Sequence, residues 1–272
     1  MRYDLHVHTY FSDGLHSPAT VINNALDRGL DGISITDHDT VLGLEEATLY
    51  SNKFDNFNVI PGIELSCIYE NNEVHILGYF IDYSNDRLIS TTNELRKHRL
   101  TRIEKIVGKL SKLKIDVDIE KIKEKNDNDF IGRVAVAREL VSKGYVSNTQ
   151  EAFSRYLNPG KPAHVERYKL SIDDAISLIK GADGIPVLAH PGLIKDKYLV
   201  QLCIDKGIEG IECIHSKHTQ SQTKNFKNLA NRHNLIVTGG SDCHGDLTNG
   251  ELLLGKYYID LSLIPKMKER IK

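Results

Sequence analysis

The chain has 272 residues, of which 40% are hydrophobic, and its formal net charge is −2 at pH 7. This length suits one large α/β domain, or one domain with a sizeable insertion. The small charge excludes a global basic field that would attract long duplex nucleic acid. No apolar run is long enough for a membrane span, and the four scattered cysteines indicate reduced thiols, so we expect a cytoplasmic protein with no membrane contact.

The first predicted strand ends in His6 and His8, which are two residues apart and therefore point to the same face. Asp13 follows in a loop that can return its carboxylate to the same place. Two nitrogen ligands and one oxygen ligand suit a divalent ion such as Zn²⁺ or Mn²⁺. An isolated pair of histidines is also typical of a surface strand beside a turn, so the prediction depends on ligand-type residues elsewhere.

Strands and helices alternate through residues 1–85. Ser17 and Pro18 are typical of a helix start. His38 follows the second strand, Glu64 lies near the end of the third, and His75 lies in the fourth. The predicted helices cover 17–28 and 43–50, and the predicted strands after the first cover 32–36, 59–65 and 74–81.

The pattern changes over residues 86–170, where charged residues and Asn are dense and strand signals are weak. Helical periodicity is found at 94–113, 134–143 and 150–157. We therefore predict a helical insertion, or cap, subdomain at 86–170 and a main domain formed by 1–85 and 171–272. The helix at 94–113 carries acids as well as bases, which is typical of a solvated face.

The alternation then returns, and ligand-type residues again follow the strands: His190, His215, and the pair Asp242 and His244. Alternating strands and helices predict a mainly parallel sheet. An open, doubly wound sheet would spread these residues along one edge, whereas a closed barrel brings them to one mouth. We favour a distorted α/β barrel of seven strands, with later strands at 185–189, 210–214 and 235–240 and helices at 171–180 and 219–233.

Nine residues at strand ends form the candidate metal site: His6, His8, Asp13, His38, Glu64, His75, His190, Asp242 and His244. Nine ligands exceed the need of one ion and suit two or three, with Glu64 as a natural bridge. Three divalent ions would leave positive charge that a hydroxide and a phosphate group can balance, whereas two ions would better suit a neutral amide or ester. The set therefore predicts attack of metal-bound hydroxide on a phosphate ester.

The segments DLHVHTYFSDG, TDHD, GIEL, VHILGY, AHPG and GSDCHG, in this order, resemble the PHP (polymerase and histidinol phosphatase) family. The resemblance implies a distorted (β/α)7 TIM-like barrel with three divalent ions, which could be Mn²⁺, Fe²⁺ or Zn²⁺. Carried over by motif, one ion would be held by His6, His8, Glu64 and Asp242, a second by Asp13, His38 and His244, and a third by Glu64, His75 and His190. We expect catalytic roles for Asp13, His190 and His215.

The segments DFIGR at 129–133 and GKPAHV at 160–165 resemble one branch of this family, whose members hydrolyse nucleoside 3',5'-bisphosphates or trim short RNA from its 5' end. The expected substrate contacts are Arg133, Lys161, His164 and His215. The expected substrate is a phosphorylated nucleotide or a short single-stranded RNA, with no obligate protein partner. The branch often has GRPH where this chain has Ala135 in place of the histidine, which leaves the exact substrate open.

Two alternatives remain at this point. A histidinol-phosphate phosphatase could use the same barrel, although the helical insertion and its Gly132-Arg133 pair argue against it. A non-catalytic accessory module, such as the PHP domains attached to polymerases, is disfavoured because all nine ligand positions are present.

Overall fold

The computed structural model describes residues 1–70, 72–124, 131–248 and 250–271. The chain divides into two compact units, one formed by Met1–Thr92 and Lys169–Lys272 and the other by Asn93–Tyr168. We call them the barrel unit and the helical unit. Within the described ranges, no helix has the length and apolar character needed to cross a membrane. That the helical insertion is an independent domain remains a prediction.

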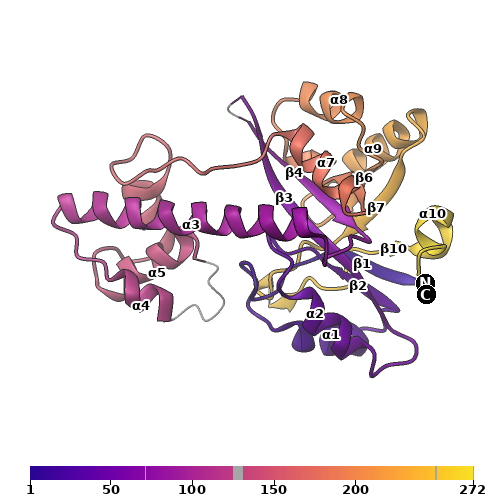
Figure 1. Cartoon of the computed structure of the whole chain (residues 1–272), viewed down its shortest axis with the longest axis horizontal. Helices are drawn as coiled ribbons and strands as arrows, with labels where there is room; N and C mark the ends of the chain where they lie inside the picture. The colour runs from indigo at the N-terminus through magenta and orange to yellow at the C-terminus, as the bar shows by residue number, and fades with distance from the viewer. Residues whose placement is uncertain (71, 125–130, 249, 272) are drawn as a thin grey trace. The chain divides into compact units, whose positions relative to one another are not determined.

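The barrel unit is built on a sheet of eight strands in the order β10-β1-β2-β3-β4-β5-β6-β7 (Figure 1). The first and seventh strands also meet, since Asp242 donates its backbone N–H to His6 O at 2.9 Å and Val7 pairs with Cys243. The sheet is therefore a nearly closed barrel, and the predicted distorted (β/α)7 fold is confirmed. The strands are β1 (Arg2–Val7), β2 (Gly32–Ile35), β3 (Asn58–Tyr69), β4 (Asn72–Tyr79), β5 (Ile185–Leu188), β6 (Gly210–His215), β7 (Ile236–Gly240) and β10 (Ile259–Asp260).

Helices follow the strands of the barrel unit as the sequence pattern predicts. Ser17 and Ser171 cap two of them by accepting the N–H of Thr20 at 3.2 Å and of Asp174 at 3.1 Å. The helix at 198–205 and the short elements after residue 246 were not predicted. The helices are α1 (Pro18–Asp27), α2 (Leu44–Ser51), α7 (Ile172–Gly181), α8 (Tyr198–Asp205), α9 (Gln220–Arg232) and α10 (Pro265–Lys268), and a hairpin pairs β8 (Leu247–Thr248) with β9 (Glu251–Leu252).

The distortion of the barrel comes from β4, which runs antiparallel to both β3 and β5. Strand β3 continues to Tyr69 because its second half pairs with β4 as a long hairpin. Glu64 therefore lies in the middle of β3, and the prediction that it ends a strand is wrong. His75 lies near the start of β4 and opposite Ser66, so the reversed direction of β4 brings its first residues to the mouth of the barrel.

Asp4 closes the barrel from the inside. Its buried carboxylate accepts the backbone N–H groups of Ser241 and Gly255, both at 2.8 Å, and of His6 at 3.3 Å. Burial raises the pKa of Asp4 to about 6, although these hydrogen bonds oppose the rise. The side chains of Tyr3 and Tyr79 belong to the apolar core of the barrel unit. One carboxylate thus ties β1 to the chain that follows β7.

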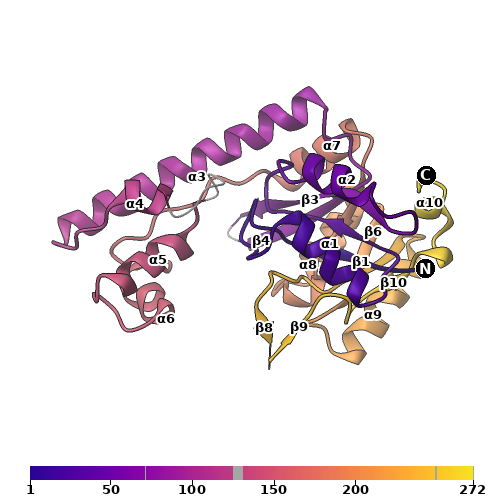
Figure 2. The ribbon, with the colours of Figure 1, turned by 90° about the horizontal axis from the view of Figure 1, so that it is seen from below.

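The helical unit has its own apolar core, in which Ile103, Ile106, Leu110, Leu140 and Leu157 are fully buried. Its short helices lie along one side of the long helix α3 (Figure 2). Asp129 and Phe130, which belong to the predicted DFIGR motif, lie outside the described residues. The elements are α3 (Asp86–Lys112), which begins in the barrel unit, α4 (Ile119–Glu124), α5 (Arg133–Ser142), α6 (Thr149–Ala152) and a π-helical turn (Phe153–Leu157).

The close contact between β1 and β7 predicts that a methyl group added at Gly240 would destabilise the barrel. A Cβ atom at Gly240 would lie 2.4 Å from His6 Cβ and 2.5 Å from His6 N. We expect Gly240→Ala to lower the free energy of unfolding by about 1–3 kcal/mol, because packed cores resist added atoms. Chemical denaturation would measure it. Gly108→Ala is the control, because a Cβ there meets no atom within 4 Å and alanine favours a helix. Equal stability of the two variants would contradict the tight closure.

Candidate metal centre

The loop after β1 is held in place by Asp37, a buried carboxylate at the end of β2. Asp37 accepts the backbone N–H of Thr9 at 2.7 Å and also binds the hydroxyl groups of Thr9 and Ser12. Gly14 allows the tight turn, since a Cβ there would lie 2.7 Å from His8 O. The loop therefore returns the carboxylate of Asp13 to the imidazoles of the barrel mouth.

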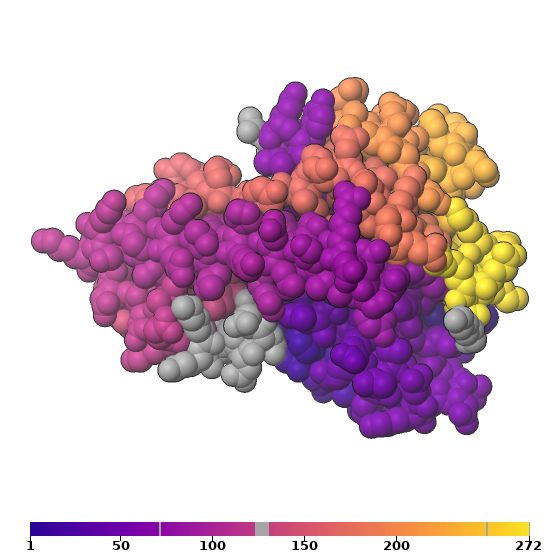
Figure 3. All heavy atoms as spheres, viewed as in Figure 1, coloured from indigo at the N-terminus to yellow at the C-terminus, as the bar shows by residue number. Residues whose placement is uncertain are grey.

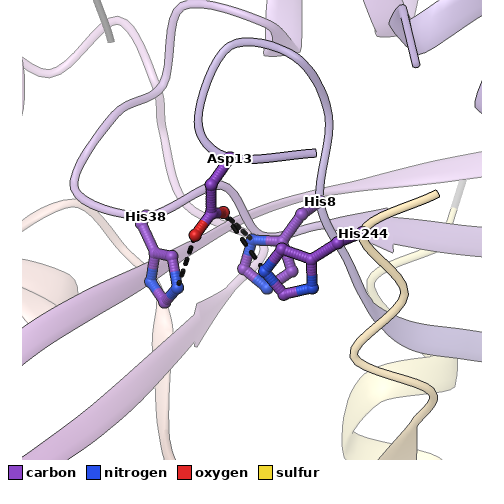
Figure 4. A group of neighbouring side chains, drawn as sticks. All are labelled: His8, Asp13, His38 and His244. Carbon is purple, nitrogen blue, oxygen red and sulfur yellow. Dashed lines mark ion pairs between the residues drawn. The ribbon is translucent and has the colours of Figure 1, made fainter. Parts of the chain in front are cut away.

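Asp13 faces three imidazoles, which come from the segments that follow β1, β2 and β7 (Figure 4). Asp13 Oδ1 lies 3.1 Å from His244 Nε2, and Oδ2 lies 3.8 Å from His38 Nε2. The rings of His8 and His244 are stacked with their centres 4.1 Å apart. One ligand atom from each of these four residues lies within 4.8 Å of the others, which is a spacing that one cation can bridge.

Glu64 is the centre of the cluster, and its two oxygens face different histidines. Oε2 lies 3.0 Å from His38 Nδ1 and 3.3 Å from Nε2 of both His6 and His8. Oε1 lies 2.7 Å from His75 Nδ1 and 3.0 Å from His190 Nε2. The side chain of Glu64 is 1% exposed. A single buried carboxylate therefore lies between two separate sets of histidines.

Asp242 completes the ring of carboxylates. Its Oδ1 lies 3.1 Å from His8 Nε2 and 3.4 Å from His6 Nε2, while Oδ2 lies 3.4 Å from His215 Nε2. His6, His8, Glu64 and Asp242 form a second group with ligand atoms within 4.8 Å of one another. The structure thus brings all nine candidate residues into one continuous cluster, and their role as metal ligands remains a prediction.

The carboxylates and imidazoles of the cluster shift one another's pKa values. Burial alone would raise the pKa of Glu64, but the surrounding imidazoles hold it well below its usual value. Burial lowers the pKa of His38 to about 4. For His8 the carboxylates of Asp242 and Glu64 outweigh burial and raise the pKa to about 10, and for His75 the carboxylate of Glu64 contributes to a rise to about 9. Burial and the nearby charges thus act on these pKa values in opposite directions.

Several imidazole nitrogens of the cluster are buried and make no hydrogen bond within the described residues, even where a carboxylate oxygen lies close by, as Glu64 Oε2 does to His38 Nδ1. They are both ring nitrogens of His8, Nδ1 of His38 and Nδ1 of His190. An unpartnered buried polar atom is costly, so its lone pair needs another role. Divalent ions fit this donor set, which combines imidazole nitrogens with carboxylate oxygens.

Glu212 was missed by the sequence interpretation. It is fully buried in β6, where Oε1 accepts the N–H of His6 Nδ1 at 2.9 Å and Oε2 accepts the backbone N–H of His190 at 2.7 Å. His190 has φ +25°, a conformation that L residues rarely adopt. One carboxylate therefore fixes the tautomer of His6, so that Nε2 faces the cluster, and also holds a strained turn. The sequence feature that could have indicated it is a charged residue within an otherwise apolar strand, because a buried charge needs a partner.

His215 lies at the end of β6 with its side chain inside the cluster. Its Nδ1 accepts the backbone N–H of Lys217 at 3.1 Å, so Nε2 carries the hydrogen and faces Asp242. Its ring centre is 5.4 Å from that of His190. His215 lies beside the candidate metal ligands. Its catalytic role remains a prediction.

The other expected substrate contacts lie in the helical unit. Arg133 Nη1 and His164 Nδ1 both donate to the carbonyl of Leu157, each at 3.1 Å, and the guanidinium lies 5.2 Å from the ring centre of Phe153. Lys161 is exposed. Ala135, which replaces the expected histidine, packs against the apolar core of the unit. Within the helical unit, Arg133 and His164 therefore bind the backbone at Leu157, at the end of the π-helical turn.

The model of the PHP domain family matches residues 4–171. The chain belongs to the PHP domain family. The match covers more than half of the chain and includes six of the nine candidate ligands, from His6 to His75, whereas His190, Asp242 and His244 lie beyond it.

Two curated relatives of this PHP chain cover most of its length. A 3',5'-nucleoside bisphosphate phosphatase of Chromobacterium violaceum is 33% identical over 89% of this chain and 86% of its own. A 5'-3' exoribonuclease of Haemophilus influenzae is 32% identical over 97% of both chains. A more distant relative, from Eggerthella lenta, is named a cyclic phosphate diphosphodiesterase. The predictions of the PHP family and of a phosphoester hydrolase are confirmed.

Solved structures agree with the fold. A protein assigned as a metal-dependent phosphoesterase, from Bifidobacterium adolescentis, has a TM-score of 0.85 at 29% identity and covers 98% of this chain and 96% of its own. A Chromobacterium violaceum protein described as an amidohydrolase with bound sulfate and no metal has a TM-score of 0.79 at 32% identity and covers 90% of this chain and 88% of its own.

The contacts of Glu212 predict that it positions the ligands. In Glu212→Gln the amide has only one acceptor oxygen for two donors, so an N–H group would face His6 Nδ1 or the His190 amide. We expect metal affinity to fall by about 10–100-fold, the usual cost of losing a carboxylate behind a ligating histidine. Calorimetric titration with Mn²⁺ or Zn²⁺ would measure this change.

Glu212→Asp is the conservative comparison, because it keeps both acceptor oxygens and should recover part of the affinity. The melting temperature of the metal-free variants separates ligand positioning from a general loss of stability. Unchanged metal affinity in Glu212→Gln would show that Glu212 does not position His6 or His190.

Proposed function

We propose that this PHP chain holds three divalent ions and hydrolyses phosphate monoesters of nucleotides or the 5' ends of short RNA. The nucleotide substrates are 3',5'-bisphosphates or nucleoside monophosphates. The observation that carries the proposal is the cluster around Glu64, in which imidazoles with unpartnered nitrogens surround three carboxylates. The names of the relatives support the choice of substrate class.

The contacts suggest which side chains would share each ion. The two oxygens of Glu64 face separate sets of histidines, so this carboxylate suits a bridge between ions. Bound divalent ions would act as Lewis acids and lower the pKa of water. The proposed sets are His6, His8, Glu64 and Asp242 for one ion, Asp13, His38 and His244 for a second, and Glu64, His75 and His190 for a third.

The charge of the cluster supports a phosphate substrate. The three carboxylates of Asp13, Glu64 and Asp242 carry three negative charges, and neutral imidazoles add none. Three divalent ions would therefore leave an excess of positive charge that suits a phosphate dianion. The anion bound by the sulfate-containing relative is of the same kind.

Three side chains are proposed to take part in proton transfer and orientation. Nε2–H of His215 faces Asp242 at 3.4 Å, where it could donate to a leaving oxygen. Asp13 is 41% exposed, the most accessible carboxylate of the cluster, and is placed to orient water. His190 is held by Glu212 with its Nε2 toward Glu64.

Arg133, Lys161 and His164 are proposed as contacts for the phosphate or the nucleotide. A planar guanidinium suits phosphate because it can form two parallel hydrogen bonds. Arg133 is held by Leu157 O through Nη1, which would fix the orientation of its guanidinium.

The substrate proposal predicts a ranked activity panel. With Mn²⁺, Fe²⁺ or Zn²⁺ added in turn, we expect phosphate release from nucleoside 3',5'-bisphosphates and from 5'-phosphorylated short RNA. Histidinol phosphate should be hydrolysed much more slowly. Faster hydrolysis of histidinol phosphate would favour the first alternative, and no hydrolysis with any metal would favour an accessory module.

The bridging position predicts a severe effect of Glu64→Gln. The amide loses the charge that two ions would share, so we expect kcat to fall by roughly a hundred-fold or more at saturating metal. Steady-state kinetics on the best substrate would measure it. Glu209→Gln is the control, because Glu209 precedes β6 and pairs with Lys266 away from the cluster. Near wild-type turnover in Glu64→Gln would exclude the bridge.

A further inference from the structure

The helical unit is basic although the whole chain is not. Residues 93–168 contain 17 lysines and arginines and 11 aspartates and glutamates, which gives a net charge of +6, whereas the whole chain has −2. Such an imbalance produces a local positive potential that attracts anionic partners.

Part of this charge forms a stripe on α3. Positions at alternating spacings of four and three share one face of a helix. Figure 3 shows that one flank of α3 is open to solvent. Of the acids in this part of the helix, Glu104 lies off the stripe and Glu94 precedes it by about one turn. The stripe consists of His98, Arg102, Lys105, Lys109 and Lys112.

The chain at 164–168 runs beside this stripe in the opposite direction. Lys109 donates to His164 O, Arg102 Nε donates to Val165 O at 2.8 Å, and the ring of His98 stacks on Tyr168. A groove of about 500 Å³ lies between the two segments. Its walls include Lys105, Lys109, Lys112, His164 and Glu166.

The charges in the groove are mostly available to a ligand. Lys105 and Lys112 have no carboxylate partner in the part of the chain that the structure describes. Glu166 accepts a hydrogen bond from His164 Nε2 at 2.9 Å, so its charge is partly engaged. The groove can therefore bind phosphate groups along the helix.

The stripe ends in an exposed aromatic pair. The rings of His98 and Tyr168 are 4.2 Å apart at 24°, and Tyr168 is 54% exposed. An exposed ring beside basic side chains suits the stacking of an unpaired base. A duplex would not present its bases in this way, and an acidic peptide would gain nothing from the ring.

We propose that the stripe and the Tyr168 platform form a binding site for single-stranded RNA within the helical unit. The inference rests on the proposed function, which makes RNA a substrate, and it adds a site formed by residues of the helical unit alone. The site would hold nucleotides other than the one being hydrolysed, and so favour RNA over mononucleotides.

Fluorescence anisotropy with the full-length protein and 5'-phosphorylated single-stranded RNA of 12 nucleotides tests this site, with chelator present to prevent cleavage. We expect Lys105→Ala/Lys112→Ala to weaken binding about ten-fold or more and to reduce the salt dependence by about 0.7 per lost phosphate contact. Tyr168→Ala should weaken binding at least about five-fold.

The matched control is Lys97→Ala/Lys121→Ala, which removes the same charge from exposed positions outside the stripe and should bind RNA like the wild type. Equal losses in both double variants, or unchanged binding in Lys105→Ala/Lys112→Ala, would overturn the site. Equal affinity for polyglutamate, unaffected by Tyr168→Ala, would also overturn it. Because binding is measured without turnover, failure of the proposed hydrolysis would be seen separately.

Discussion

The barrel mouth depends on one buried carboxylate, that of Glu64. Its oxygens lie within 3.3 Å of nitrogens from five imidazoles, which come from β1, β4 and the segments after β1, β2 and β5. A buried carboxylate is costly unless it is paired, so these strands must meet in one register for the charge to be stabilised. The same contacts that stabilise the charge assemble the candidate ligands.

Other buried carboxylates hold the backbone around this centre. Asp4 joins β1 to the chain after β7, Asp37 fixes the loop that carries Asp13, and Glu212 binds both His6 and the strained turn at His190. Each accepts hydrogen bonds from segments that are distant in sequence. The candidate ligands are therefore held in fixed orientations by the barrel, as hydrogen bonds around metal sites usually hold the ligands.

Much of this arrangement could be predicted from local patterns. The two-residue spacing of His6 and His8 and the caps at Ser17 and Ser171 depend on neighbouring residues alone. The reversed strand β4 was not predicted, although the segment between the expected strands 59–65 and 74–81 is too short for a parallel crossover and therefore favours a hairpin. Glu212 was missed because its partners, His6 and His190, are distant in sequence. The basic stripe on α3 was interpreted as a solvated face, since its pairing with 164–168 is a tertiary contact.

The central claim is that Glu64 bridges ions held by the nine clustered side chains. Anomalous diffraction from crystals grown with Mn²⁺ or Zn²⁺ tests it most directly, because the peaks count the ions and locate them. The account predicts three peaks at the barrel mouth, with at least two of them beside the carboxylate of Glu64. A single peak, or peaks that do not contact Glu64, would contradict it.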